Sequence, residues 1–364
     1  MVRIDVLNIT KRFGEKLALD DVTLALKERS FTCILGPPGA GKTTLLKIIA
    51  GLEEPDTGKI YFDGVDVTAI PPQKRGVRMM FQTLALYSNM NVFNNIAFPL
   101  KTLKRLSDNE IKKRVHEVAD FLKIGHLLDR PILQLSGGEM QRVAIARTLV
   151  VDSEIYLLDE PLVNLDYKLR EDMRGELKIM YRELNKTLIY ATPDPVEPPA
   201  MAEYVAVMDK GKIKQYGRVN EVYEHPSDIF VGSYFGSPAM NLLDCTVTEK
   251  DEKLVLDASL FKIDASSLRD ALLPYVGNEL ILGIRPERMH ISDKPMPNLP
   301  SFEANLYLIE TLGSEVVLHL TAGSALLRAL SPRLYKGRVG ESVWVYFSLS
   351  DTNIFDKKSG KAII

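Results

Sequence analysis

The chain has 364 residues, of which 46% are hydrophobic and 26% are charged, and its formal net charge is −2. These values predict a globular protein of two or three domains. They exclude a chain whose net charge alone attracts nucleic acid or an anionic membrane. The only two cysteines, Cys33 and Cys245, exclude a disulfide framework and favour a reducing compartment.

The sequence lacks the apolar segments that direct a protein to a membrane or anchor it there. Residues 1–5 do not have the apolar region of a signal peptide. No run approaches the ~18 apolar residues of a spanning helix. If the protein works at a membrane, we therefore expect other subunits to hold it there.

The N-terminal segment predicts two strands around an exposed aromatic side chain. Residues 2–9 alternate between apolar and polar types, as an edge strand does, and residues 17–26 predict a second strand. We expect a turn at residues 11–14. Phe13 in that turn either stacks on a nucleotide base or packs locally, and the residue type alone does not distinguish the two.

A glycine-rich loop connects an apolar strand at residues 31–35 to a helix that ends near Gly51. This context identifies the pattern G-x-x-x-x-G-K-[ST] as a phosphate-binding loop, in which glycines let successive N–H groups point at phosphate oxygens beside the positive end of the helix. We expect the lysine to bridge the terminal phosphates and the first threonine to ligate Mg²⁺. The loop residues are Gly36, Pro37, Pro38, Gly39, Ala40, Gly41, Lys42, Thr43 and Thr44.

Helical periodicity begins after a short strand at residues 77–81, which ends at Gln82. We interpret residues 83–130, extended to about 150 by a second helix, as a helical subdomain inserted in an α/β domain. Ser107 and Glu110 have the spacing of a capping box. Ser136, Gly137 and Gly138 offer a hydroxyl and two N–H groups at the start of the second helix. They form either a second anion cradle, which completes a partner's nucleotide site, or a plain helix cap.

A buried strand at residues 155–158 ends in two adjacent acids, Asp159 and Glu160. Downstream of a phosphate-binding loop, the first acid is expected to hold Mg²⁺ through water. The second is expected to act on the attacking water as a base or polariser. The alternative role for such acids is that of helix caps.

The sequence pattern changes again near residue 237, after which it predicts short strands separated by turns. This pattern is typical of a small β-barrel or sandwich. A stretch rich in glycine, serine and proline marks the change, so we predict domains at 1–236 and 237–364. The expected strands are 253–257, 279–285, 302–309, 315–320, 325–330 and 341–347.

The order of these motifs resembles that of an ABC transporter ATPase. The stretches 81–87, 95–100, 236–241 and 282–287 narrow the resemblance to the ATPase subunit of maltose-type carbohydrate importers. The resemblance covers essentially the whole chain. It implies an α/β P-loop NTPase domain with an inserted helical subdomain, followed by an all-β, OB-like (TOBE-type) regulatory domain.

The resemblance also implies roles for individual residues. Phe13 would stack on adenine, Gln82 would contact Mg²⁺ and couple to the permease, and Glu160 would be the catalytic carboxylate. The metal would be held by Thr43, Gln82 and Asp159. The signature loop that closes on ATP of the opposite subunit would be Ser136, Gly137, Gly138 and Glu139, and Asp166 would be the loop acid that crosses the dimer interface.

The same resemblance implies the partners. Two ATPase subunits would sandwich two ATP with Mg²⁺ at the cytoplasmic face of the membrane. They would be held there by two integral permease subunits, and an extracytoplasmic solute-binding protein would act indirectly. The helical insert would receive the permease's coupling helix. Sugars, polyols and glycerol phosphates all remain open as substrates, with carbohydrate or polyol favoured by the resemblance.

The sequence departs from the family pattern at the switch histidine, which is replaced by Pro193. Proline supplies neither a side-chain donor nor an N–H. The loss of one donor aimed at developing phosphate charge costs on the order of 10²–10³ in rate, so we expect the site to bind ATP and hydrolyse it poorly. Glu139 stands where the family usually has glutamine, and Val163 where it usually has serine.

Three interpretations follow. The one we favour makes the chain the weaker half of an ATPase heterodimer, whose signature loop serves a competent site on a different partner. In the second, the chain is a fully active homodimeric importer ATPase that tolerates Pro193. The third is a non-transport ABC protein acting on nucleic acid. It is disfavoured because residues 237–364 lack a basic stripe with interleaved aromatics, so we expect no nucleic-acid partner.

Overall fold

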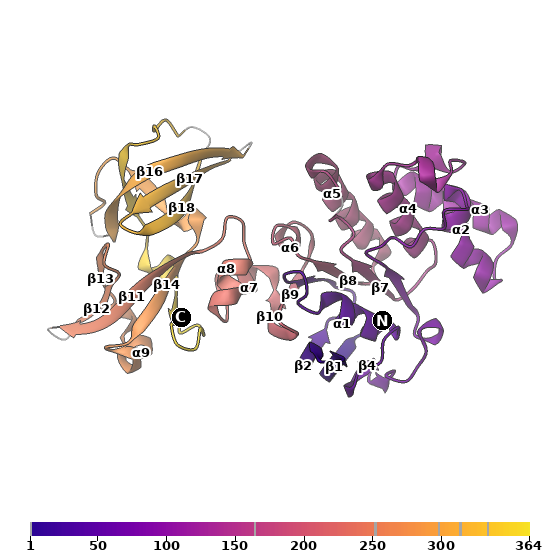
Figure 1. Ribbon diagram of the computed structural model, residues 1–364, viewed down its shortest axis with the longest axis horizontal. Helices are drawn as coiled ribbons and strands as arrows, with labels where there is room; N and C mark the ends of the chain where they lie inside the picture. Colours follow the sequence, from indigo (N-terminus) through magenta and orange to yellow (C-terminus); the bar gives the residue numbers. More distant parts are fainter. Residues whose placement is uncertain (1, 164, 251–252, 298, 313–314, 333–334) are drawn as a thin grey trace. The chain divides into compact units, whose positions relative to one another are not determined.

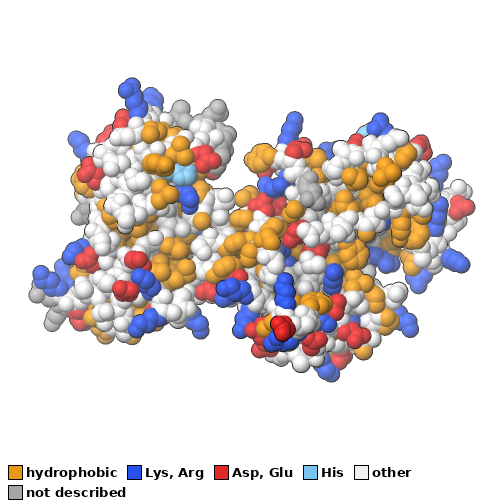
Figure 2. Space-filling view, in the orientation of Figure 1, with side chains coloured by type: hydrophobic (Ala, Val, Ile, Leu, Met, Phe, Trp, Pro, Cys, Tyr) orange, Lys and Arg blue, Asp and Glu red, His pale blue; other side chains and the backbone are white. Residues whose placement is uncertain are grey.

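The computed structural model describes residues 2–163, 165–250, 253–297, 299–312, 315–332 and 335–364. Two compact units are present, one ending at Val219 and the other beginning at Asn220 (Figure 1). On the face drawn in Figure 2, basic and acidic side chains are interspersed over both units. This mixture agrees with the small net charge of the chain.

The first unit is built on a six-stranded sheet with the order β10-β9-β3-β8-β7-β6. All its neighbours are parallel except β9 and β10. The three central strands are buried on both faces, which explains their continuous apolar sequence. The strands are β3 (Phe31–Leu35), β6 (Val77–Met80), β7 (Ile155–Asp159), β8 (Thr187–Thr192), β9 (Tyr204–Asp209) and β10 (Lys212–Arg218).

A second, antiparallel sheet of the first unit has the order β2-β1-β4-β5. β1 lies between β2 and β4, so the prediction of an edge strand at residues 2–9 is wrong. Alternation of apolar and polar residues indicates that one face of a strand is buried. It does not indicate whether the strand lies at the edge of its sheet. β1 also continues through Phe13, where we expected a turn. The strands are β1 (Ile4–Phe13), β2 (Lys16–Leu26), β4 (Thr57–Phe62) and β5 (Val65–Asp66).

Helices complete the first unit. The capping box predicted for α3 is confirmed, because Ser107 and Glu110 exchange both of its hydrogen bonds. The α2, α3 and α4 helices lie together as the expected helical subdomain (Figure 1). The helices are α1 (Lys42–Ala50), η1 (Pro72–Lys74), α2 (Val92–Leu103), α3 (Asp108–Phe121), η2 (Gly125–Leu127), η3 (Ile132–Gln134), α4 (Gly137–Leu149), α5 (Tyr167–Leu184) and α6 (Glu197–Met201).

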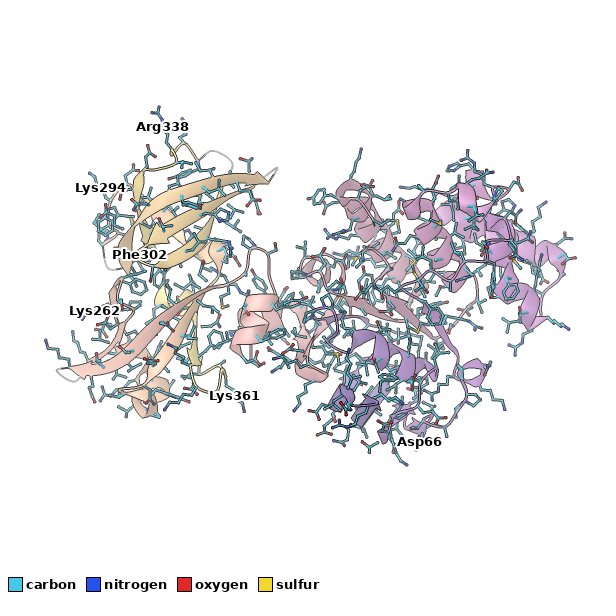
Figure 3. The ribbon with its side chains drawn as sticks, viewed as in Figure 1. Asp66, Lys262, Lys294, Phe302, Arg338 and Lys361 are labelled. Atoms are coloured by element: carbon cyan, nitrogen blue, oxygen red, sulfur yellow. The ribbon has the colours of Figure 1, made fainter. Side chains whose placement is uncertain are left out.

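The second unit contains two five-stranded antiparallel sheets, with the orders β13-β12-β11-β14-β20 and β15-β19-β16-β17-β18. They enclose one apolar core, in which Phe302 stacks on Phe261 with 5.2 Å between the ring centroids (Figure 3). The strands are β11 (Asn241–Lys250), β12 (Lys253–Asp257), β13 (Lys262–Asp264), β14 (Glu279–Ile284), β15 (His290–Ser292), β16 (Ser301–Leu312), β17 (Glu315–Ala322), β18 (Ala325–Pro332), β19 (Ser342–Tyr346) and β20 (Thr352–Asp356).

Short helices also belong to the second unit, and the sequence did not predict that α7 and α8 pack there. The guanidinium of Arg285 donates to the backbone carbonyls of Tyr223, Gly232 and Phe235, and so holds both helices. The division between units therefore falls before the predicted boundary at 236/237. The helices are α7 (Val219–Glu224), α8 (Ile229–Tyr234), η4 (Ser266–Leu268), α9 (Arg269–Leu272), η5 (Leu273–Tyr275), η6 (Pro286–Arg288) and η7 (Leu349–Asp351).

Candidate functional site

The glycine-rich loop joins β3 to α1 and needs glycine at defined positions. Gly39 and Gly41 have φ values of +83° and +107°, which L side chains rarely adopt. A Cβ on Gly41 would lie 2.6 Å from the carbonyl oxygen of Ala18, and one on Gly36 would lie 2.3 Å from that of Met208. The loop is therefore a tight backbone turn at the start of a helix, which is the geometry of an anion site.

Lys42 lies in the centre of this loop and is only 3% exposed. Its Nζ donates to the carbonyl oxygens of Gly36 at 2.8 Å and Pro37 at 3.1 Å. The same atom lies 3.2 Å from Oε1 of Glu160. The sequence separates these residues by more than a hundred positions, and the structure brings the ammonium and the carboxylate together at the mouth of the loop.

Glu160 itself has a strained backbone, with φ at +49°. Its N–H donates to the carbonyl of Ala191 at 3.0 Å, which holds it against β8. Its Oε2 accepts from Nε2 of Gln82 at 2.8 Å. This conformation aims the carboxylate between Lys42 and Gln82, instead of along the axis of β7.

Asp159 and Thr43 form the floor of the site. The Thr43 hydroxyl donates to Oδ1 of Asp159 at 3.0 Å. Asp159 is 1% exposed, and burial raises the pKa of its carboxyl, opposed by the Thr43 hydrogen bond. A buried carboxylate at this position gains most from a bound cation.

The donor atoms here suit Mg²⁺. Thr43 offers a hydroxyl and Asp159 a carboxylate. The side-chain nitrogen of Gln82 donates to Glu160, and its side-chain oxygen has no hydrogen-bond partner among the described residues. No group of three His, Cys, Asp or Glu side chains that could hold a metal occurs among the described residues. Mg²⁺ is typically held by one or two protein oxygens, with waters and phosphate oxygens as the rest. The residues present fit that pattern.

The segment that carries Pro193 also lies at this edge of the sheet. The N–H of Gly36 donates to the carbonyl of Thr192 at 3.2 Å, so position 193 is adjacent to the start of the loop. The Thr192 hydroxyl donates to the buried carboxylate of Glu197 and accepts from the N–H of Asp194. Pro193, which has neither a side-chain donor nor an N–H, therefore follows directly on the residue bonded to the start of the loop.

The remaining predicted residues lie on other elements. Phe13 ends β1, is 48% exposed, and has Nζ of Lys11 5.2 Å from its ring centroid. Asp166 caps α5 by accepting from the N–H of Leu169 at 2.9 Å. Asn164, which begins the same predicted turn, lies outside the described residues.

Ser136 and Glu139 form a capping box at the start of α4. Oε2 of Glu139 accepts from both the N–H and the hydroxyl of Ser136, and these bonds lower the pKa of the Glu139 carboxyl. These residues form the helix cap that was one of the two alternatives. The other alternative, an anion site, is compatible with it because Gly137 and Gly138 still present backbone N–H groups in the first turn of α4. Glu139 therefore has a local structural role in the cap.

Sequence reasoning missed two sets of supporting contacts. Asp194 forms ion pairs with Arg174 at 3.0 Å and Arg170 at 3.4 Å, which tie the segment after β8 to α5. Arg147 on α4 donates to the carbonyls of Leu84 and Ala85, both in left-handed conformation, just after Gln82. The four-residue spacing of the two arginines on α5 was a visible signal, but their partner lay 20 or more residues away.

An apolar groove of about 520 Å³ lies beside Gln82, between the six-stranded sheet and the helical subdomain. Tyr87 and Phe98 contact each other across it, with 4.7 Å between ring centroids. Both side chains are exposed, so a partner helix could cover them. Other lining residues are Leu52, Met79, Phe81 and Leu103.

Comparison with known proteins agrees with this geometry. Residues 19–163 match the ABC transporter family, residues 236–289 the MalK OB fold domain, and residues 282–355 the TOBE domain. The trehalose/maltose import ATP-binding protein MalK of Thermococcus litoralis is 41% identical over the full length of both chains. The chain belongs to the ABC transporter ATP-binding proteins.

Other members of this family are similar over most of their length. The maltose/maltodextrin import ATP-binding protein MalK of Photobacterium profundum is 40% identical over 88% of this chain and 86% of that protein. An uncharacterized ABC transporter ATP-binding protein of Bacillus subtilis, YurJ, is 35% identical over 98% of each.

A solved ATP-binding cassette, dimeric and in a post-hydrolysis state bound to ADP and Pi, has a TM-score of 0.55 and 31% identity. The match covers 59% of this chain and 98% of the solved chain. The predicted fold, an ABC ATPase domain followed by an OB/TOBE-type all-β domain, is confirmed. Family membership makes this ABC protein an ATPase of the transport class, which binds ATP, typically with Mg²⁺.

Replacing Asp159 with Asn should stabilise the nucleotide-free protein. Because burial raises the carboxyl pKa above its usual 3.8, the folded protein at pH 7 carries a buried charge that the unfolded chain hydrates. We expect the free energy of unfolding in urea to rise at pH 7. The gain should shrink as pH falls through the raised pKa toward 3.8, where the wild-type carboxyl takes up its proton.

Asp172→Asn, on the exposed face of α5, is the matched control and should leave the free energy of unfolding unchanged at either pH. A destabilised Asp159→Asn protein, or a gain that does not vary with pH, would contradict the assignment of a desolvated charge at position 159.

Proposed function

We propose that this protein is the ATP-binding subunit that powers an ABC importer of sugars, polyols or related solutes through ATP-driven dimer closure. The observation that carries the proposal is the full-length similarity to a trehalose/maltose import ATP-binding protein, with the MalK-type OB and TOBE domains in the same order. The relatives' names favour a disaccharide over a polyol. Neither they nor the near-neutral charge of the chain favour the nucleic-acid alternative.

In this proposal the residues act as follows. Lys42 and the N–H groups of residues 36–44 hold the phosphates, and Phe13 stacks on adenine. Bound Mg²⁺, held by Thr43, Asp159 and Gln82, would neutralise charge on the phosphates. Glu160 accepts a proton from, or polarises, the water that attacks the terminal phosphate. Its strained backbone holds it within reach of Gln82, whose side chain fixes the direction of the carboxylate.

Two further parts of the proposal concern the partner subunit. Ser136 to Glu139 would close on ATP held by a second ATPase subunit, and Asp166 would lie at that interface. A solved cassette of the same fold is dimeric and binds ADP and Pi, which supports this arrangement. A Cβ on Gly137 would meet no atom within 4 Å, so the first residue of α4 leaves room for the approach of a phosphate, whereas Gly138 is covered by Leu169.

The apolar groove beside Gln82 is proposed to receive a helix of the permease. In the described part of the chain, no helix has the length and apolar character to cross a membrane. Attachment to two permease subunits, with a solute-binding protein outside, would hold the protein at the cytoplasmic face. Arg147, which fixes the loop after Gln82, links the groove to the residue that contacts Glu160.

Phe98→Asp tests the importer proposal directly. A charge placed in the groove should abolish co-purification with the permease and sugar uptake into vesicles containing permease and solute-binding protein, because an unpaired carboxylate is costly to bury. Maltose, trehalose and glycerol are compared as substrates.

Leu133→Asp, at a position that is 79% exposed and outside the groove, is the control and should leave co-purification intact. Circular dichroism establishes that both variants fold. The proposal fails if the wild-type protein captures no permease, or if Phe98→Asp binds permease as well as Leu133→Asp does.

Reduced turnover at the chain's own site is a separate part of the proposal. It rests on Pro193. The carbonyl oxygen of the preceding residue, Thr192, accepts a hydrogen bond from the N–H of Gly36. Pro193→His should therefore raise the ATP hydrolysis rate of the purified protein by on the order of 10²-fold, by restoring a donor near the terminal phosphate. Pro195→His, two residues further on, is the control and should have little effect. Brisk hydrolysis by the unmodified homodimer would overturn this part.

Pairing with a different ATPase subunit is favoured by the same proline, and homodimerisation is the alternative. Glu160→Gln distinguishes the two in the assembled transporter. In a heterodimer the partner's competent site should keep part of the ATPase activity, whereas in a homodimer both sites are lost. Glu183→Gln, exposed on α5, controls for loss of charge. Complete loss of phosphate release in the Glu160→Gln complex would establish the homodimer.

A further inference from the structure

A second cavity of about 720 Å³ lies in the first unit, outside the phosphate-binding loop. It is lined by η1 and β6, by the C-terminal end of α2 with the turn into α3, by α3 itself, and by the segment before β7. Figure 1 shows α2 and α3 side by side at one end of the unit. Neither Lys42 nor the other residues of the nucleotide site line this cavity.

Four basic side chains converge on the cavity: Lys74, Arg78, Arg105 and Arg114. They come from four different elements, namely η1, β6, the α2–α3 turn and α3. No ion pair or side-chain hydrogen bond joins any of them to a residue in the described part of the chain. Other cations of the first unit are paired, as Lys59 is with Asp66 and Lys186 with Glu154.

Arg78 is the strongest sign of a missing ligand. Its side chain is partly buried, and its Nε is fully buried without a hydrogen-bond partner. A guanidinium stays charged in proteins, so a buried and unpaired donor costs stability unless something accepts from it.

The acidic residues near the cavity are already engaged. Asp152 and Glu154 line it, but both face Lys186, at 3.6 and 2.5 Å. Glu110, which attracts Arg114 weakly, accepts from the N–H and the hydroxyl of Ser107. The four basic side chains therefore leave the cavity with excess positive charge, although the chain as a whole has a net charge of −2.

We propose that this cavity binds a phosphate group. Three guanidinium groups and one ammonium can surround a tetrahedral dianion with charge-assisted hydrogen bonds, and arginine forks match phosphate oxygens in pairs. The cavity is large enough for a phosphate ester as well as for free phosphate. The group comes either from a soluble phosphate compound or from the headgroup of an anionic phospholipid, and the experiment below separates these sources.

The cavity adjoins the apolar groove beside Gln82, because Gln73, Arg78 and Leu103 line both. A ligand on Arg78 would therefore contact the wall of the groove and change how a helix fits there. This consequence rests on the proposed docking of the permease. Phosphate binding itself does not, and it is measured on the isolated chain.

The test titrates inorganic phosphate into the full chain carrying Lys42→Ala, which removes the main phosphate contact of the nucleotide loop. Isothermal calorimetry should still detect one phosphate, with a dissociation constant on the order of 1 mM or tighter. Adding Arg78→Met or Arg114→Ala should weaken that binding about tenfold each, the loss expected for one charge-assisted contact. Lys112→Ala, on α3 but outside the cavity, is the matched control and should leave binding unchanged.

Arg114 is exposed, so its replacement keeps the test valid even if Arg78→Met unfolds. Co-sedimentation with phosphatidylcholine vesicles, with and without phosphatidylglycerol, identifies the source. Recovery with the anionic vesicles that is lost in Arg114→Ala but not in Lys112→Ala supports a lipid headgroup, whereas phosphate binding without such recovery supports a soluble ligand. Absence of both kinds of binding, or equal binding by Arg114→Ala and Lys112→Ala, overturns the proposal.

Discussion

Parallel pairing of β3 with β8 and of β8 with β7 is the constraint on which the nucleotide site depends. Because parallel strands end at the same edge, the glycine-rich loop, the acids at 159 and 160, and the segment at 192–194 meet there. The Thr43–Asp159 hydrogen bond joins residues 116 positions apart, and the Lys42–Glu160 ion pair depends on the same geometry. Displacement of any one of these strands would separate the groups that must act together.

Two residues of the site are held in conformations or environments that cost free energy of folding. Asp159 is charged and buried, and Glu160 has a left-handed backbone that a residue with a Cβ disfavours. The surrounding core supplies the compensation, since β3, β7 and β8 are buried along their whole length. A partly strained and desolvated site of this kind gains more from a bound cation and phosphate than a relaxed one would.

Glu139 and Pro193 have different structural consequences. Glu139 is accommodated without loss, because Ser136 donates to it twice and the start of α4 stays regular. Beside Pro193 the backbone is held by Thr192, which is bonded to Gly36, Asp194 and Glu197, and the proline itself has neither a side-chain donor nor an N–H. Glu139 thus forms part of a helix cap, whereas Pro193 adds no hydrogen-bond donor beside the loop.

What the sequence by itself determined was local. The phosphate-binding loop, the acids after a buried strand and the Ser107 cap follow from short patterns, because glycine conformation, strand burial and capping depend on neighbours a few residues away. Only the tertiary structure decided that β1 is central, that α7 and α8 join the second unit through Arg285, and that Asp194 pairs with Arg174. It also decided that Lys74, Arg78, Arg105 and Arg114, none of which has an ion-pair partner in the described part of the chain, line one cavity. These features depend on contacts between distant segments. Neither an alternating apolar pattern nor the charge of a residue indicates which distant residue it will contact.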